Sequence, residues 1–252
     1  CLRCRVAFGL NASPVTNPNS VRVGLIIFAM HPLWVAELID VEGAFLQGKF
    51  TEGEELYIRV PDGFEKFYGD DEVLRLNVPI YGTKQAASCF YKALVAKVTD
   101  RNYQRSKADP CVYYMWKEGR LCMIMSWVDD LLVLGCREDV EQIRADLHSA
   151  FDCKDEGALK EYVGSKIDIE RQESGIARIK FTQPVLVQKL KDEYNLPAGR
   201  APKTPAVAGQ VLVRGDGKGT VSSREATVYR SGVATMMFMM QWSRPDIYNA
   251  TR

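Results

Sequence analysis

Two adjacent acids divide an otherwise apolar run in the stretch Ser126-Trp-Val-Asp-Asp-Leu-Leu-Val-Leu-Gly135, and this stretch decides how the chain folds. The pattern predicts two strands joined by a tight turn, because Asp is common in turns. Neighbouring carboxylates that are partly buried repel each other unless a cation neutralises them. Two interpretations of Asp129 and Asp130 therefore stay open: the turn of a structural hairpin, or part of a site that binds a cation.

The segments around this hairpin predict alternating helices and strands. Apolar residues at helical spacing indicate a helix capped by Ser20 and further helices over 86–98, 140–151, 182–194 and 229–242. Extended runs indicate strands over 36–41, 55–60, 111–116, 121–128, 131–135 and 162–169. Reduced to its core, the order is strand, helix, strand, strand, helix, strand, which is the split βαβ, ferredoxin-like plan. We therefore expect an α+β fold.

This topology predicts where a third acid lies. In the split βαβ plan the first two strands run parallel, and the third strand returns between them. Asp40 ends the first strand, so it should lie at the same edge of the sheet as the turn with Asp129 and Asp130. Three carboxylates suit Mg²⁺, which keeps waters and substrate phosphates as its other ligands. Two such ions can stabilise both the attacking and the leaving oxygen of a phosphoryl displacement.

The composition excludes several classes of protein. The chain has 252 residues, of which 46% are apolar and 26% charged, so it can bury a core and is not disordered. Its longest apolar run, Val23 to Met30, is too short for a membrane span, which needs ~20 residues. The two histidines, His31 and His148, lie near no partner motif, which argues against a zinc site or a catalytic triad. We expect an intracellular fragment of a longer chain, because it has no signal segment and no initial Met.

The patterns of charge and of cysteines say less about function. The net charge of +1 gives no nucleic-acid signal by itself. Residues 40–75 hold ten acids against four bases, and residues 76–128 hold eight bases against three acids. Metal beside phosphate and ordinary solvated surface both account for this contrast. Cys1 and Cys4 form a lone C-x-x-C, which is no zinc site, and the remaining cysteines are expected to be buried thiols: Cys89, Cys111, Cys122, Cys136 and Cys153.

Several blocks of sequence follow one another in a fixed order. They are Leu38-Ile-Asp-Val-Glu-Gly-Ala-Phe-Leu-Gln-Gly48, Ile80-Tyr-Gly-Thr-Lys-Gln-Ala-Ala-Ser-Cys-Phe-Tyr91 and Trp127-Val-Asp-Asp-Leu-Leu-Val133, flanked by blocks at 13–15, 159–164 and 229–247. Together they resemble, over nearly the whole chain, the reverse transcriptase of copia-type retrotransposons. Trp127 stands where the family usually has Tyr, and Ala87 where it usually has Pro.

The resemblance implies a catalytic role for the three acids. Asp40, Asp129 and Asp130 would bind two Mg²⁺ ions, or Mn²⁺, with the backbone carbonyl of Val41 as a further ligand. Phe45 would stand under the deoxyribose and clash with a 2′-hydroxyl. Without the resemblance, Phe45 would be interpreted as a core aromatic residue.

The resemblance also implies contacts with substrates. The nucleotide pocket would be formed at the start of the helix over 86–98, where free N–H groups favour phosphate, by Tyr81, Gly82, Lys84 and Gln85. The primer terminus would lie near Tyr162, Gly164 and Lys166. An ordinary turn into a helix and a plain edge strand are the alternative interpretations of these two groups.

The implied organisation is that of a polymerase. Residues 1–172 would form partial fingers and palm, 173–214 a thumb-like segment, and 215–252 a linker and helix leading towards a ribonuclease H domain that lies outside the chain. We expect the domain to synthesise DNA from dNTPs on a primed RNA or DNA template. We expect no membrane among its partners. Protease, integrase and ribonuclease H would be the other domains of a Pol polyprotein, in a cytoplasmic particle or the nucleus. The alternatives are a decayed copy that folds and at most binds nucleic acid, and a different metal-dependent phosphotransferase on the same plan. Because Arg3 and Arg5 are the only basic remnant of the fingers, we expect residues 1–252 alone to polymerise poorly.

Overall fold

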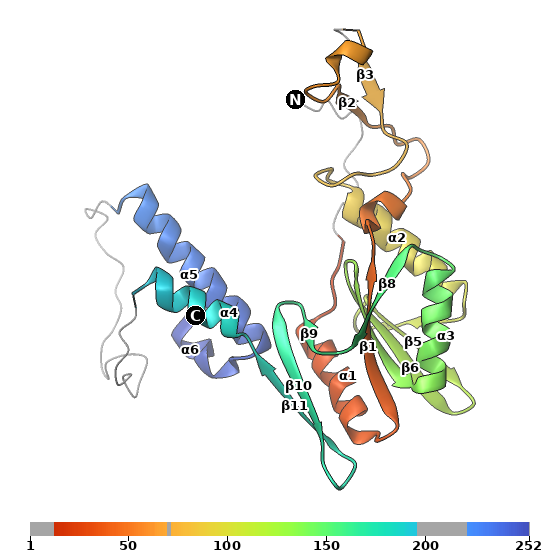
Figure 1. Ribbon diagram of the computed structural model, residues 1–252, viewed down its shortest axis with the longest axis vertical. Helices are drawn as coiled ribbons and strands as arrows, with labels where there is room; N and C mark the ends of the chain where they lie inside the picture. Colours follow the sequence, from red (N-terminus) through yellow and green to blue (C-terminus); the bar gives the residue numbers. More distant parts are fainter. Residues whose placement is uncertain (1–12, 70–71, 196–220, 252) are drawn as a thin grey trace. The chain divides into compact units, whose positions relative to one another are not determined.

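The computed structural model describes residues 13–69, 72–195 and 221–251 (Figure 1). Its contacts divide the chain into two compact units. The first comprises Cys1–Leu159 and Arg171–Ala177, and the second comprises Lys160–Glu170 and Arg178–Arg252.

A six-stranded antiparallel sheet forms the centre of the first unit. Its order is β4-β5-β6-β7-β1-β8, from the strands β1 (Trp34–Val41), β4 (Gln104–Arg105), β5 (Val112–Lys117), β6 (Arg120–Trp127), β7 (Asp130–Cys136) and β8 (Cys153–Ala158). β7 pairs antiparallel with both β1 and β6, so β1 and β6 run parallel with β7 between them. This is the strand arrangement expected from the sequence around the two acids.

The strand that closes the sheet differs from our expectation. The sequence predicts 162–169 as the last strand of the split βαβ unit, but β8 is the strand that pairs with β1 at the edge of the sheet. Residues of the expected strand form β9 (Glu161–Tyr162) and β10 (Ser165–Arg171), which join β11 (Ala177–Thr182) in a separate three-stranded sheet. β8 reads Cys-Lys-Asp-Glu-Gly-Ala and lies at the edge of its sheet, where charged residues are favoured and the apolar alternation of a strand is lost.

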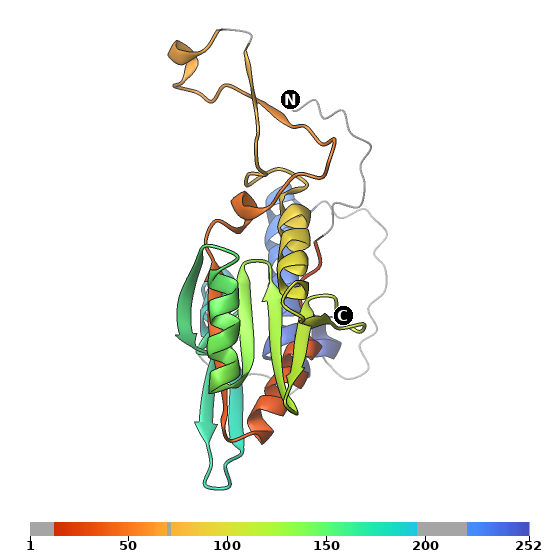
Figure 2. The same ribbon diagram turned by 90° about the vertical axis from the view of Figure 1, so that its right-hand side faces the viewer.

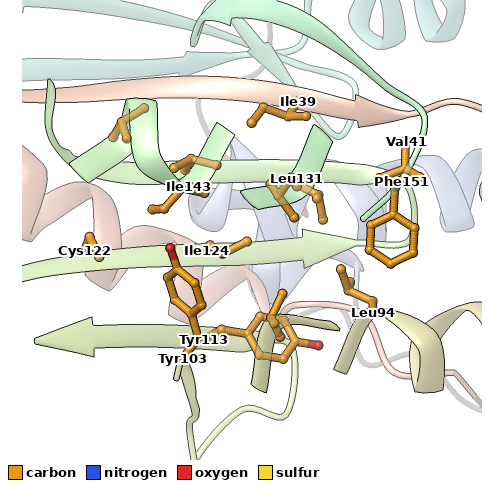
Figure 3. Packing of buried hydrophobic residues seen from close by; sticks show 14 of the residues in the cluster. Ile39, Val41, Leu94, Tyr103, Tyr113, Cys122, Ile124, Leu131, Ile143 and Phe151 are labelled. Atoms are coloured by element: carbon orange, nitrogen blue, oxygen red, sulfur yellow. The ribbon is translucent and has the colours of Figure 1, made fainter. Parts of the chain in front are cut away.

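The main core lies between the sheet and two helices. α2 (Ala86–Thr99) and α3 (Arg137–His148) lie on one face of the sheet, and Figure 2 shows both in front of it. Their apolar residues pack against every second residue of the strands, because successive side chains of a strand point to opposite faces. Figure 3 shows this cluster, in which Ile39 of β1, Leu131 of β7 and Ile143 of α3 are each 1% exposed or less.

A third helix, α1 (Pro18–Met30), covers part of the opposite face. It buries Val21, Gly24, Leu25 and Phe28, and a Cβ on Gly24 would lie only 2.1 Å from the terminal methyl of Met125. The cap is Asn17, whose side chain accepts the N–H of Asn19 at 2.9 Å, and Pro18 follows at the first helical position. The prediction of Ser20 as the cap was therefore wrong by one turn.

Between β1 and α2 the chain makes a long excursion. It contains the short helix η1 (Ala44–Gln47), a two-stranded sheet of β2 (Tyr57–Arg59) and β3 (Val73–Arg75), and the short helix η2 (Glu65–Phe67). The predicted extended run over 55–60 is confirmed in part as β2.

The second unit combines the small sheet with helices. These are α4 (Pro184–Glu193), α5 (Ser223–Trp242), the short helix η3 (Pro245–Ile247) and α6 (Tyr248–Thr251). α5 begins six residues earlier than predicted, because Ser222 and Glu225 form a capping box. Within this unit the rings of Tyr162 and Trp242 meet edge to face, with centroids 6.2 Å apart. The predicted linker over 215–220 lies outside the described residues.

The expectations about membrane spans and about the cysteines mostly concern residues that the structure describes. In the described part of the chain no helix is long and apolar enough to cross a membrane. The described cysteines are all free: Cys89, Cys111 and Cys122 are buried as predicted, whereas Cys136 and Cys153 are only half buried. Cys1 and Cys4 lie outside the described residues.

Candidate active site

Asp40 and Asp130 lie directly opposite each other on neighbouring strands. They are paired positions in the antiparallel register of β1 with β7. Because Ile39, Val41 and Leu131 point into the main core, the alternation of a strand turns both aspartates to the other face of the sheet. Both side chains are half exposed there. The sequence-based prediction that Asp40 and the turn acids meet at one edge of the sheet is confirmed.

Asp129 lies in the two-residue turn that joins β6 to β7. Trp127 and Asp130 are the last paired residues, so Val128 and Asp129 make the connection. The backbone carbonyl of Asp129 accepts the N–H of Val41 at 3.1 Å, which ties the turn to the residue after Asp40. Val128 has a φ of 55°, in the left-handed region that a β-branched residue rarely adopts. Such strain costs of order 1–3 kcal/mol and is common at active sites.

Burial and neighbouring charge disfavour the ionised forms of Asp40 and Asp130. Burial, the largest cause, and the charges of Asp129 and Asp40 together raise the pKa of Asp130 to about 6. Burial also raises the pKa of Asp40, with the charge of Asp129 as the second cause. Ionised together, the carboxylates form a concentration of negative charge that a cation would relieve.

Two residues of β8 extend the site and were missed in the sequence. Lys154 is the register partner of Asp40, and its Nζ lies 2.5 Å from Oε1 of Glu156. The Lys154 charge lowers the pKa of Asp40, whereas the Glu156 charge raises it. The sequence carries no strand signal there, because 152–156 reads Asp-Cys-Lys-Asp-Glu without the alternation of apolar and polar residues that marks a half-buried strand.

The acids do not form a preformed metal cage. Among residues 13–69, 72–195 and 221–251, no three His, Cys, Asp or Glu side chains lie close enough together to hold an ion. The possible ligands are nevertheless all oxygen atoms and carry excess negative charge, which suits Mg²⁺. This ion commonly binds only one or two carboxylates and completes its coordination shell with water and phosphate oxygens. The donor chemistry therefore fits a divalent ion that arrives with a phosphate-bearing substrate.

Phe45 lies close to one predicted pocket residue. It belongs to η1, is half buried against the main core, and its ring centroid lies 4.6 Å from that of Tyr81. Tyr81 is 58% exposed, so the pair presents an aromatic surface to solvent. The two blocks of sequence that carry Phe45 and Tyr81 are thus brought together.

The other predicted pocket residues lead into α2. Gly82 has a φ of 89° and open space around it, and Lys84 is exposed. Gln85 precedes the first residue of α2 and is buried, with its carbonyl accepting the N–H of Cys89 at 2.9 Å. Gln85 therefore has a structural place at the start of the helix.

The residues predicted near the primer terminus lie in the second unit. Tyr162 is 2% exposed, and Val163 and Gly164 turn the chain from β9 into β10 with φ values of 48° and 66°. Lys166 is exposed, with its Nζ 3.1 Å from Oδ1 of Asp168. The structure gives these residues no placement relative to the three aspartates.

A segment before α1 supports the strand that leads into the turn with Asp129. Thr16 is fully buried, and its hydroxyl donates to the carbonyl oxygen of Ser126 at 2.6 Å, next to Trp127. The Thr16 N–H donates to the same oxygen at 3.1 Å. The buried carboxylate of Asp109 accepts the N–H groups of Asn17 and Cys111. The block at 13–15 thus leads into a buried anchor of β6.

The mixed α/β fold is consistent with a polymerase-like domain. A sequence model described as "Reverse transcriptase (RNA-dependent DNA polymerase)" matches residues 4–208, and the chain belongs to this family. The resemblance to copia-type reverse transcriptases is thereby confirmed, as is the class of RNA-directed DNA polymerases.

Relatives in plants and yeast match most of this chain. The chain is 30% identical to "Retrovirus-related Pol polyprotein from transposon TNT 1-94" of Nicotiana tabacum, over 94% of this chain and 18% of the relative. It is 26% identical to the Pol polyprotein from transposon RE2 of Arabidopsis thaliana, over 93% of this chain and 15% of the relative. It is 24% identical to "Putative transposon Ty5-1 protein YCL074W" of Saccharomyces cerevisiae, over 83% of this chain and 65% of the relative. The chain thus spans less than a fifth of the two plant polyproteins.

Proposed function

We propose that this domain extends a primer 3′-hydroxyl with deoxynucleotides on an RNA or DNA template. The observation that carries the proposal is the register of Asp40 opposite Asp130, with Asp129 in the adjoining turn. The site lies on the face of the sheet away from α2 and α3, where the carboxylates are accessible. The central strands β8-β1-β7-β6 would then be a ferredoxin-like polymerase palm.

Each element of the site has a proposed task. Asp40, Asp129, Asp130 and the carbonyl of Val41 would hold two divalent ions, Mg²⁺ or Mn²⁺. Bound there, such ions neutralise charge on the reacting phosphate oxygens. The chain itself orients the groups, since the pairing of β1 with β7 fixes the distance between the strands that carry the acids.

The aromatic pair and the start of α2 would bind the nucleotide. Phe45 would exclude a 2′-hydroxyl, and Tyr81 would lie beside it. Gly82, Lys84 and Gln85 would line the phosphate side, because a helix N-terminus has free N–H groups that favour anions. Tyr162, Gly164 and Lys166 would contact the primer end.

The domain would work as one part of a larger protein. We propose partial fingers and palm over 1–172, a thumb over 173–214 and a connection over 215–252. The relatives in tobacco and Arabidopsis are named Pol polyproteins, so protease, integrase and ribonuclease H would be neighbouring domains. A primed RNA template in a cytoplasmic particle, or in the nucleus, would be the setting.

Primer extension tests the proposal. The purified chain is given an RNA template, a labelled DNA primer, dNTPs and Mg²⁺ at low salt. We expect slow extension that Asp129→Asn abolishes and that Asp100→Asn, at an exposed position after α2, leaves unchanged. Removal of a transition-state charge partner costs on the order of 10²–10³ in rate.

Trp127, which stands beside the acids where the family usually has Tyr, favours one alternative, a decayed copy that binds nucleic acid without polymerising. That copy would retain a primed template in a gel-shift assay with steep salt dependence and extend no primer. Product made by the unmodified chain and lost in Asp129→Asn would exclude it.

A further inference from the structure

One side chain closes the loop that follows Asp40. Gln47, the last residue of η1, donates from Nε2 to the carbonyl oxygens of Glu42 at 2.6 Å and Asp152 at 3.1 Å. Its Oε1 accepts the backbone N–H of Asp152 at 2.9 Å. The N–H of Glu42 also donates to the Asp152 carbonyl at 2.9 Å. The Gln47 carboxamide therefore joins the loop after β1 to the segment that enters β8.

The next residue holds the loop from the other side. Gly48 has an ordinary φ of −74°, so its backbone conformation does not require glycine. A Cβ there, however, would lie 2.9 Å from the backbone nitrogen of Phe90 and 3.1 Å from the carbonyl carbon of Cys89. Both of these atoms belong to the backbone of α2 and cannot move aside cheaply. The absence of a side chain thus permits η1 to rest directly on α2.

These two anchors determine where Phe45 lies. η1 has only four residues. Two backbone hydrogen bonds close it: the N–H of Leu46 donates to the Gly43 carbonyl at 2.7 Å, and the N–H of Gly48 donates to the Phe45 carbonyl at 3.3 Å. In so short a turn, fixing Gln47 and Gly48 fixes the backbone of Phe45. The half-buried Phe45 ring then packs against the core on one side and against Tyr81 on the other.

We propose that Gln47 is the positioning residue for sugar selection: its carboxamide holds η1 so that Phe45 meets the nucleotide at a fixed place. The inference rests on the proposed function, in which Phe45 excludes the 2′-hydroxyl. Gln47 itself would touch no substrate. Without the Gln47 carboxamide, η1 would be free to move and the Phe45 ring would move with it. A mobile Phe45 ring would discriminate less between deoxyribose and ribose.

The first measurement needs no catalysis. The chain is labelled with fluorophenylalanine, and the Phe45 signal is assigned by its disappearance in Phe45→Leu. We expect one narrow ¹⁹F line in the unmodified chain, and a shifted or broadened line in Gln47→Leu. The matched control is Gln142→Leu, which removes one side-chain hydrogen bond, to Asp146 at 3.1 Å, from an exposed face of α3. An unchanged Phe45 line in Gln47→Leu would overturn the inference.

The second measurement reads selectivity. The ratio of kcat/KM for a dNTP over the matching rNTP should fall roughly tenfold in Gln47→Leu, about the effect of one net hydrogen bond, and stay constant in Gln142→Leu. An unchanged ratio in Gln47→Leu would contradict the inference. If the unmodified chain incorporates neither nucleotide, the proposed function fails, while the Phe45 line still decides whether Gln47 positions the ring.

A second variant covers the case in which Gln47→Leu does not fold. Gly48→Ala disturbs the other anchor, because its Cβ would press on the α2 backbone. Like Gln47→Leu, Gly48→Ala should shift the Phe45 line and lower the ratio of kcat/KM for a dNTP over the matching rNTP. A folded Gly48→Ala chain with an unchanged line would count against a fixed η1 as the basis of selectivity.

Discussion

Asp40 and Asp130 are direct cross-strand partners in the pairing of β1 with β7, two chain segments that lie far apart in the sequence. Directly opposite residues of an antiparallel pair have Cβ atoms ~4.5–5.5 Å apart, and like charges there are destabilising. The sheet therefore stores an electrostatic repulsion at this point. A change that removes one of the two charges should relieve this repulsion.

Asp130→Asn should stabilise the fold near neutral pH in the absence of divalent ions. The pKa of Asp130 is raised to about 6, above the ~3.9 of an unfolded Asp, so the native state prefers the protonated form. Its contribution is therefore favourable below pH ~4 and is lost as the pH rises through about 6. Because the side chain is half exposed, we expect a gain on the order of 1 kcal/mol at pH 7.

Urea denaturation of both chains from pH 4 to 7 measures this effect. The advantage of Asp130→Asn should shrink as the pH falls from 6 to 4, and Asp100→Asn should show no such trend. Addition of Mg²⁺ should stabilise the unmodified chain more than the variant. An advantage that does not change with pH would contradict the account.

Val128→Asn should raise stability and lower DNA synthesis. Asn tolerates the left-handed region better than Val, so relief of the strain at φ 55° should contribute about 0.5–1 kcal/mol. If the strained turn holds Asp129 in place, a relaxed turn holds it less well. Thermal denaturation and primer extension measure the two effects.

The chain offers a matched control for the Val128 variant. Glu118 has a φ of 52° in the turn between β5 and β6, away from the three aspartates. Glu118→Asn relieves the same kind of backbone strain but also removes the ion pair with Arg120 at 3.4 Å, so its gain in stability should be smaller, and it should leave synthesis unchanged. Equal synthesis by both variants would show that strain at Val128 has no role in the reaction.

Phe45→Ala should admit ribonucleotides. Removal of the ring removes the proposed clash with the 2′-hydroxyl and also the contact with Tyr81. Incorporation of rNTPs relative to dNTPs should rise by roughly 10²-fold, the order of effect that a misplaced positioning group produces. Phe67→Ala, which truncates an exposed aromatic of the same excursion, serves as the control. If Phe45→Ala leaves the incorporation of rNTPs relative to dNTPs unchanged, Phe45 does not exclude the 2′-hydroxyl sterically.

The sequence predicts the centre of this fold and site because its signals there are strong. Apolar runs of β-forming residues around Asp129 and Asp130 define β6 and β7, and the split βαβ plan then brings Asp40 to them. The same reasoning missed β8, since Lys154 and Glu156 on an edge strand carry no apolar alternation. The pairing of Asp40 with Lys154 was missed with it.

Other features follow from contacts that sequence patterns do not encode. The positive φ of Val128 is imposed by the pairing of Trp127 with Asp130, against the preference of the residue itself. The bonds from Gln47 to Asp152 join residues 105 positions apart. The early start of α5 was, in contrast, visible in the spacing of Ser222 and Glu225 as a capping box.

The most direct test of the central claim is the location of the divalent ions in a complex of this chain with a primed template and an unreactive dNTP. Crystals grown with Mn²⁺ would reveal its position by anomalous scattering. We predict two Mn²⁺ peaks ~3.5–4 Å apart, bound by carboxylate oxygens of Asp40 and of the Asp129–Asp130 turn and by nucleotide phosphates. Peaks bound elsewhere, or a bound nucleotide without Mn²⁺ at these aspartates, would contradict the account.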